Sequence, residues 1–240
     1  MSNSKPTWPR LIIPDGTLEA LKWLALLLMT GDHVDKYLFN GTKALLFDTG
    51  RIVMPLFIFV LAYNLARPGA LDRGAYPRTI KRLILFGVLA TPIFIVLGGV
   101  KDGWWPLNII FTLLSLTVVL FLVEQHTTGG YVTAAVIFLI SGSSVEFWWP
   151  ALALGVTTWW YCKRPGWIPL ALALTALSSL WFINQNMWAL AAVPIALTSI
   201  TVDFRVPRLK WVFYAYYPLH LIVLWLIRIP MGKAGHLFFY

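Results

Sequence analysis

Long apolar runs, separated by short polar or basic segments, recur along the whole chain and decide its class. A helix of about 20 apolar residues crosses the hydrocarbon core of a bilayer. Charged residues make up 12% of the chain, whereas a soluble domain carries about a quarter. The sequence therefore predicts an all-α, polytopic integral membrane protein with about nine transmembrane helices, in a range of about eight to ten. The expected spans lie near residues 18–39, 51–66, 79–100, 106–123, 130–142, 145–162, 167–183, 187–202 and 209–228.

The fifth run, 130–142, is the weakest because it is short and ends in a glycine among serines. It either spans by itself or joins the next run as a broken helix, which would give eight spans. The expected organisation is a cytoplasmic N-terminal segment (1–17), a single transmembrane domain (18–228) and a periplasmic C-terminal tail (229–240). The first apolar run is expected to be an uncleaved span, because no basic start and small-residue cleavage site accompany it.

Basic residues predict the orientation of the chain. The segment from Arg67 to Arg82 holds five of them, and cytoplasmic loops are enriched in lysine and arginine. Alternating from that segment places thirteen basic residues on the cytoplasmic side and six outside. The prediction is a multi-pass membrane protein with a cytoplasmic N-terminus. The net charge of +9 is thus explained by topology and does not indicate nucleic-acid binding.

The first run carries a lysine and a histidine at its two ends, Lys22 and His33. Eleven positions on a helix amount to three turns, so both side chains point the same way, about 16 Å apart along the axis. Ionisable groups are costly against lipid. One face of this helix is therefore expected to border a polar cavity.

His33 is the strongest catalytic candidate, because histidine takes up and returns a proton near neutral pH. Asp32 and Asp48 are the candidate groups to orient it, and Arg51 begins the second run on the same side. The alternative is an interfacial loop whose charges are solvated or reach the membrane surface.

The last run contains the segment FYAYYPLHL, residues 213–221. Tyr217 and His220 are three positions apart and so are neighbours on a helix. Pro218 frees a backbone carbonyl in the middle of the membrane. A buried histidine needs a polar partner there, which makes this segment a functional candidate. The alternative is a proline-kinked helix packed on aromatic side chains.

Three basic residues, Arg78, Lys81 and Arg82, begin the third run. Arg78 and Arg82 share a helix face, which suits a phosphate clamp. Anchoring at the cytoplasmic surface is the alternative. Asn108 lies just inside the fourth run and is a weaker polar candidate.

Five stretches taken in order resemble the TraX family, which includes the F-pilin N-acetylation protein and TrbP-type conjugal transfer proteins. They are LKWLALLLMTGDHVDKYLF, TGRIVMPLFIFVLAYNL, RTIKRLILFGV, PLNIIFTLL and FYAYYPLHLIVLWLI. The resemblance covers roughly residues 18–122 and 211–227. That family is similar to transmembrane acyltransferases, many of which carry an arginine eleven residues before a first-span histidine. Here Lys22 and His33 occupy those two positions, and lysine lacks the bidentate fork of arginine.

The resemblance implies an acetyltransferase whose helices surround a polar acyl-CoA tunnel, with acetyl-CoA as cosubstrate and no metal. CoA would be held at the cytoplasmic face, with its pantetheine arm running the roughly 16 Å from residue 22 to residue 33. The resemblance also implies that the protein lies in the bacterial inner membrane and that its acceptor is the N-terminal amine of a pilin subunit on the periplasmic side. His33 would act as base, or carry the acetyl group covalently. The implied roles are catalysis for His33 and Asp32, cofactor binding for Lys22, Arg78, Arg82 and Asn108, and the acceptor site or tunnel for Asp48, Arg51, Tyr217 and His220.

Three other functions fit the sequence. The first is the same chemistry on a glycan or lipid hydroxyl. The second is a transporter or channel that uses the lysine and histidines as a proton relay, although no repeated halves are visible. The third is a non-enzymatic membrane scaffold for pilus assembly. Membrane lipid surrounds the protein in every case, and the sequence leaves the oligomeric state open.

Overall fold

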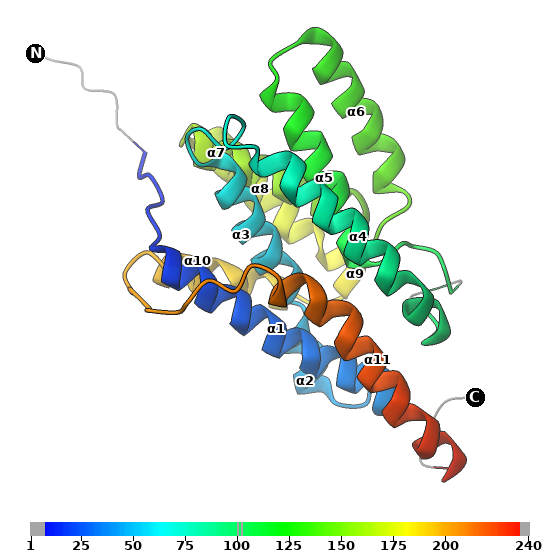
Figure 1. Cartoon of the computed structure of the whole chain (residues 1–240). Coiled ribbons are helices and arrows are strands. Elements are labelled where there is room, and N and C mark those ends of the chain that lie inside the picture. The colour runs from blue at the N-terminus through cyan, green and yellow to red at the C-terminus, as the bar shows by residue number, and fades with distance from the viewer. Residues whose placement is uncertain (1–7, 100, 102, 236–240) are drawn as a thin grey trace, which may run out of the picture.

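The computed structural model describes residues 8–99, 101 and 103–235, and helices form its framework (Figure 1). In chain order these are α1 (Asp15–Leu38), α2 (Ala44–Gly50), α3 (Val53–Ala66), α4 (Ala75–Val96), α5 (Ile109–Glu124), α6 (Thr128–Gly142), α7 (Trp148–Lys163), α8 (Trp167–Ser179), α9 (Trp181–Asn184), the 3₁₀ turn η1 (Trp188–Ala191), α10 (Ala192–Thr198) and α11 (Val212–Lys233).

The helices pack as two adjoining groups. In one, α3 packs on α7, which packs on α8, and α6 lies outside α5 (Figure 1). In the other, the N-terminal α1 lies beside the C-terminal α11, which also packs on α4. The first group has a core centred on Ile58, Leu116 and Leu152. The second has a core that includes Leu26, Leu83 and Leu221. Helices α3 and α5 contribute residues to both cores and so join the two groups.

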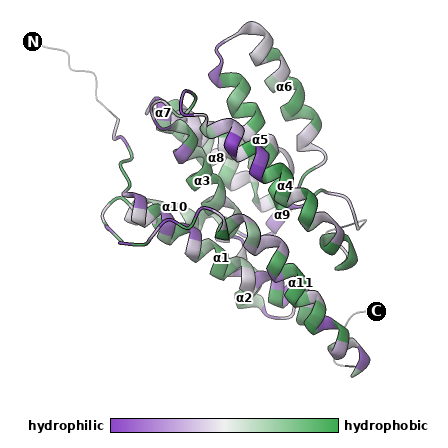
Figure 2. Cartoon of the chain, viewed as in Figure 1, coloured by the Kyte–Doolittle hydropathy of each residue, from purple (hydrophilic) through white to green (hydrophobic). Residues whose placement is uncertain are grey.

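Within the residues that the structure describes, four helical segments are long and apolar enough to cross a membrane: Ala44–Ala66, Ala75–Val96, Trp167–Asn184 and Val212–Lys233. Three shorter apolar segments accompany them, at Ile109–Glu124, Thr128–Gly142 and Trp188–Thr198. Figure 2 shows long hydrophobic stretches on α4, α6 and α11, with hydrophilic residues gathered at the beginning of α4. Large apolar side chains such as Leu89, Leu139 and Leu226 are exposed on these helices. Exposed apolar helix faces of this length are those of a membrane protein.

Each of the nine expected spans falls on helical structure, with several changes of boundary. The seventh and eighth expected spans are each built from two short helical pieces, α8 with α9 and η1 with α10. Helices α6 and α7 are separate, so the proposed single broken helix is not formed. The last helix, α11, continues to Lys233, five residues into the expected tail. Residues 1–7, 100 and 236–240, which belong to the expected termini and third span, lie outside the described residues. The number of membrane crossings stays a prediction.

Asn108 shows how local chemistry fixes one of these helices. Its Oδ1 accepts a hydrogen bond from the Ile110 backbone N–H at 3.1 Å and so caps the start of α5. Its Nδ2 donates to Gly87 O at 3.4 Å and Thr91 Oγ1 at 3.3 Å, both on α4. Just before it, Leu107 exchanges backbone hydrogen bonds with Ser144 and Glu146 in the α6–α7 connection. The beginning of α5 is thus tied to two other parts of the chain.

Candidate active site

Two histidines from opposite ends of the sequence meet inside the helical framework. His33 on α1 and His220 on α11 are joined by a 2.6 Å hydrogen bond between Nδ1 of the first and Nε2 of the second. Their rings are nearly parallel, with an interplanar angle of 6° and centroids 4.9 Å apart. His220 is buried and His33 is half-buried. The pair therefore has a fixed mutual geometry while His33 stays partly accessible.

The hydrogen-bond network assigns the protons of the neutral pair. His220 Nδ1 lies 2.9 Å from the Tyr216 carbonyl oxygen, which only accepts, so this nitrogen carries the hydrogen. His220 Nε2 then holds a lone pair and accepts from His33 Nδ1–H. It follows that His33 Nε2 has a free lone pair. That nitrogen can act as a base or a nucleophile.

Aromatic rings enclose the pair. Tyr217 stands edge-on to both histidines, with ring centroids 6.1 Å from His33 and 5.5 Å from His220. The Tyr37 ring centroid lies 5.6 Å from that of His33. The Tyr216 hydroxyl bonds Thr30 Oγ1 at 2.6 Å, and it is the donor because Thr30 donates to Leu26 O. These contacts hold the α1 and α11 backbones in register around the histidines.

A cavity of about 500 Å³ approaches the pair between α1, α3, α4, α5 and α11. Its polar lining is dominated by cations: Lys22, Arg67, Arg73, Arg78, Arg82, Arg208 and Lys210. Its apolar lining includes Leu26, Met29, Phe57, Leu61, Leu83, Ile110, Leu113 and Phe213. Tyr217 lines the cavity as well, and it is the ring that stands against both histidines. The cavity thus connects a cationic region with the immediate surroundings of the pair.

Contacts between helices show that the cations lie at one end. Lys22 Nζ on α1 lies 4.4 Å from the Phe213 ring centroid at the start of α11. Arg82 near the start of α4 lies 4.8 Å from the Trp211 ring centroid. The histidine pair lies further along both α1 and α11. Because α1, α4 and α11 run in the same direction (Figure 1), the cations form the rim and the histidines lie beyond the inner end.

Only part of the rim charge is neutralised within the described residues. Lys22 pairs with Glu19 at 2.6 Å, and Arg67 pairs with the exposed Asp15 at 2.5 Å. Arg208 Nε lies 3.8 Å from the same Glu19. The remaining cations have no ion pair with a carboxylate in the part of the chain that the structure describes; they are Arg73, Arg78, Arg82 and Lys210. The rim therefore keeps a strong positive potential.

On the far side of His33, Asp32 is engaged by Arg51 in an ion pair. The Arg51 guanidinium also lies 4.3 Å from the Phe47 ring centroid and donates to Phe47 O at 3.2 Å. Asp48 accepts a hydrogen bond from Asn186 at 3.0 Å. Neither aspartate makes a hydrogen bond to His33, so the expectation that one of them orients it is wrong for this structure. His220 occupies that position.

The predicted residues thus fall into three groups. Lys22, Arg78, Arg82 and Tyr217 line one cavity, and His33 pairs with His220. Asp32 and Arg51 pair beside them. Asn108 and Asp48 are set apart: Asn108 is fully engaged as a helix cap and does not line the cavity, because its amide points to α4. The catalytic and binding roles themselves remain predictions.

Sequence reasoning missed several residues of the site. Glu19 neutralises Lys22. The only sequence signal for this pair is the spacing of three positions between an acidic and a basic residue on one helix. Arg208 and Lys210 reach the rim from the far end of the sequence. Glu146, in the α6–α7 connection, lies within electrostatic reach of Lys36, Asp32 and Arg51. No local pattern marked it, because its neighbours are distant in sequence.

The fold and site define a class: a helical membrane protein in which a cation-rimmed cavity leads toward a buried histidine pair. Comparison with known families is consistent with this description. The chain matches the family described as TraX protein over residues 17–228 and therefore belongs to the TraX family. The match confirms the resemblance drawn from five motifs and extends through residues 124–205, which those motifs did not cover. The family is associated with pilin processing in conjugal transfer. No curated protein and no solved structure matched the chain.

Proposed function

We propose that this protein transfers an acetyl group from cytoplasmic acetyl-CoA to the N-terminal amine of a conjugative pilin on the periplasmic side of the bacterial inner membrane. The observation that carries the proposal is the cavity, which joins unneutralised cations at its rim to Tyr217 beside the His33–His220 pair. The nine-span arrangement and the cytoplasmic N-terminus belong to the same proposal. The number of spans follows from the apolar runs. The orientation follows from the basic residues at the rim, which the positive-inside rule assigns to the cytoplasm.

The two ends of the cavity suit the two ends of acetyl-CoA. Guanidinium and ammonium groups bind phosphate strongly, and the rim supplies Lys22, Arg78 and Arg82. The pantetheine arm is neutral and slender and would lie along apolar residues such as Leu26 and Leu113. The thioester would then stand near Tyr217. Residues 22 and 33 both lie on α1, about 16 Å apart by helical rise, which is of the order of the length of that arm.

His33 Nε2 would remove a proton from the acceptor amine, whose nitrogen attacks the thioester carbonyl. A C–N bond forms, the C–S bond breaks, and the leaving thiolate takes the proton from the His33 imidazolium to give CoA as a free thiol. His220 accepts the His33 Nδ1–H throughout and so keeps Nε2 pointed at the reacting atoms. Arg51, which pairs with Asp32, would stand on the acceptor side in this proposal.

A covalent route would use the same His33 nitrogen as a nucleophile, giving an acetyl-histidine that the acceptor amine then attacks. The two routes differ in one observable. Purified protein given labelled acetyl-CoA without acceptor accumulates label on histidine only in the covalent route. Absence of labelled histidine at every quench time would leave direct transfer.

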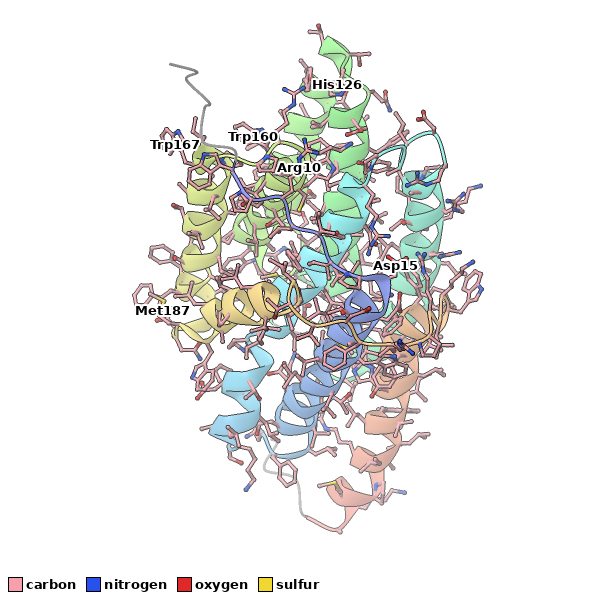
Figure 3. All side chains as sticks on the ribbon, turned by 90° about the vertical axis from the view of Figure 1, so that its left-hand side faces the viewer. Arg10, Asp15, His126, Trp160, Trp167 and Met187 are labelled. Atoms are coloured by element: carbon pink, nitrogen blue, oxygen red, sulfur yellow. The ribbon has the colours of Figure 1, made fainter. Side chains whose placement is uncertain are left out.

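The proposal is tested with full-length protein in proteoliposomes, labelled acetyl-CoA and a pilin peptide with a free N-terminus. We expect His33→Gln to abolish transfer while retaining the unfolding temperature and CoA binding. His126→Gln is the matched control, because His126 lies at the tip of the α5–α6 hairpin, far from the start of α1 at Asp15 (Figure 3). Full transfer by His33→Gln would overturn the catalytic assignment. Transfer to glycan or lipid but not to pilin would replace the acceptor, and no transfer at all would favour a scaffold or transporter.

A further inference from the structure

We propose that the connecting segment 202–211, together with the start of α4, binds the 3′-phosphate of CoA, so that the protein selects acetyl-CoA over acetyl-dephospho-CoA. The inference rests on the proposed function and adds a specificity-determining element to it. It arises from two cations, Arg208 and Lys210, which line the cavity although they lie about 190 positions from Lys22 in the sequence.

The connecting segment is held against the site by specific bonds. Thr17, which is buried at the start of α1, donates from Oγ1 to Val202 O at 2.7 Å. The same hydroxyl accepts from the Phe204 backbone N–H at 3.1 Å. The Thr17 hydroxyl thus pairs with two backbone groups of the segment, the Val202 carbonyl and the Phe204 N–H, which are not paired within a helix. This anchoring delivers Arg208 and Lys210 to the rim at defined positions.

At its other end the segment is fixed by an aromatic and cationic contact. The Arg82 guanidinium lies 4.8 Å from the Trp211 ring centroid and 5.7 Å from that of Tyr214. Arg208 lies 3.8 Å from Glu19, which also pairs with Lys22. The segment therefore bridges α1 and α4 across the mouth of the cavity. Its cations line the same cavity as Arg78 and Arg82.

The charge count fits an ADP moiety with an additional phosphate. Two acidic residues, Glu19 and Asp15, neutralise part of the rim, which leaves four described cations without a carboxylate partner. The 3′-phosphate and the diphosphate of CoA together carry about four negative charges. Dephospho-CoA lacks about half of them. An anchor for anionic lipid alone would not need these cations to line a cavity that continues to Tyr217.

The test compares CoA with dephospho-CoA on the full-length protein, both as dissociation constants and as KM values of the acetylated forms. We expect dephospho-CoA to bind about ten-fold or more weakly, because at least one charge-assisted contact is lost. Lys210→Gln and Arg208→Gln should weaken CoA but not dephospho-CoA and so reduce the ratio between them. Arg205→Gln is the matched control: it removes the same charge from the same exposed segment, but Arg205 does not line the cavity, whereas Arg208 and Lys210 do.

The outcomes are distinguishable. Transfer with equal affinity for CoA and dephospho-CoA would overturn this inference and leave the proposed function standing. A ratio unchanged in Lys210→Gln and Arg208→Gln, or lowered equally by Arg205→Gln, would also overturn it. Lys210 makes no ion pair with any residue that the structure describes, so its replacement leaves no described partner unpaired and is the variant expected to fold normally. Failure of both nucleotides to bind would overturn the inference and the proposed function together.

Discussion

Replacing His220 by phenylalanine tests the least expected feature of the site, the hydrogen bond between two histidines. Phenylalanine preserves the ring that stacks on His33 and Tyr216 but removes the Nε2 acceptor 2.6 Å from His33 Nδ1. His33 is then free to adopt the other tautomer, in which Nε2 carries the hydrogen and cannot act as base. Even in the correct tautomer, the imidazolium formed during transfer has lost its partner.

The magnitude follows from that one bond. A hydrogen bond to a charged group contributes about 1.5–3 kcal/mol, which corresponds to a loss of roughly ten- to more than a hundred-fold in rate when it acts only in the transition state. We expect this loss in kcat, with KM for acetyl-CoA unchanged, because His220 does not line the cavity. His220→Gln retains a side-chain acceptor and should recover part of the rate.

The assay is initial-rate acetyl transfer in proteoliposomes, with the unfolding temperature measured alongside for each variant. A folded His220→Phe protein with the parental kcat would refute the reasoning. So would a rise in KM at constant kcat, because the histidine would then be a binding residue and His33 would need no orienting partner. A rate for His220→Gln equal to that of His220→Phe would show that the acceptor atom is irrelevant.

Three further predictions concern the Asp32–Arg51 ion pair, the cap of α5 and the apolar part of the cavity. Asp32→Asn should lower the free energy of unfolding by about 3 kcal/mol because it leaves Arg51 half-buried and unpaired. The double variant Asp32→Asn/Arg51→Gln should recover much of this loss. If the losses of the two single variants, measured by denaturant unfolding, simply add in the double variant, the pairing is contradicted. Asn108→Ala should cost about 1 kcal/mol through loss of the α5 cap without changing CoA affinity; a selective loss of CoA binding would instead restore its predicted cofactor role. Leu113→Trp, which fills the apolar part of the cavity, should weaken CoA binding, measured by calorimetry, whereas Leu172→Trp on an exposed helix face should not.

The sequence was most informative where a relation is local. Helical periodicity placed Lys22 and His33 on one helix, α1 contains both, and the i, i+4 spacing of Arg78 and Arg82 put both on the cavity wall. The apolar runs likewise anticipated the helices, since burial in lipid imposes a continuous pattern on the chain. Such relations need no knowledge of how distant segments pack.

Relations between distant segments were not predictable in this way. His33 and His220 were each singled out, but their direct bond depends on the packing of α1 against α11. The same applies to Arg51, whose ion pair with Asp32 displaced the expected contact between that aspartate and His33. Arg208, Lys210 and Glu146 lie in connections without periodicity, and only the folded chain brings them to the site. Asn108 was a candidate because it is a polar residue at the start of an apolar run. That pattern is the same for a helix cap, which Asn108 is, and for a cofactor-binding residue.

The central claim is that His33 of this protein is required to acetylate pilin. It is tested most directly by the intact mass of pilin isolated from cells that express the unchanged protein, His33→Gln or His126→Gln at equal membrane levels. The account predicts a pilin heavier by one acetyl group with the unchanged protein and with His126→Gln, and unmodified pilin with His33→Gln. Acetylated pilin in the His33→Gln cells, or identical masses in all cells including those that lack the protein, would contradict it.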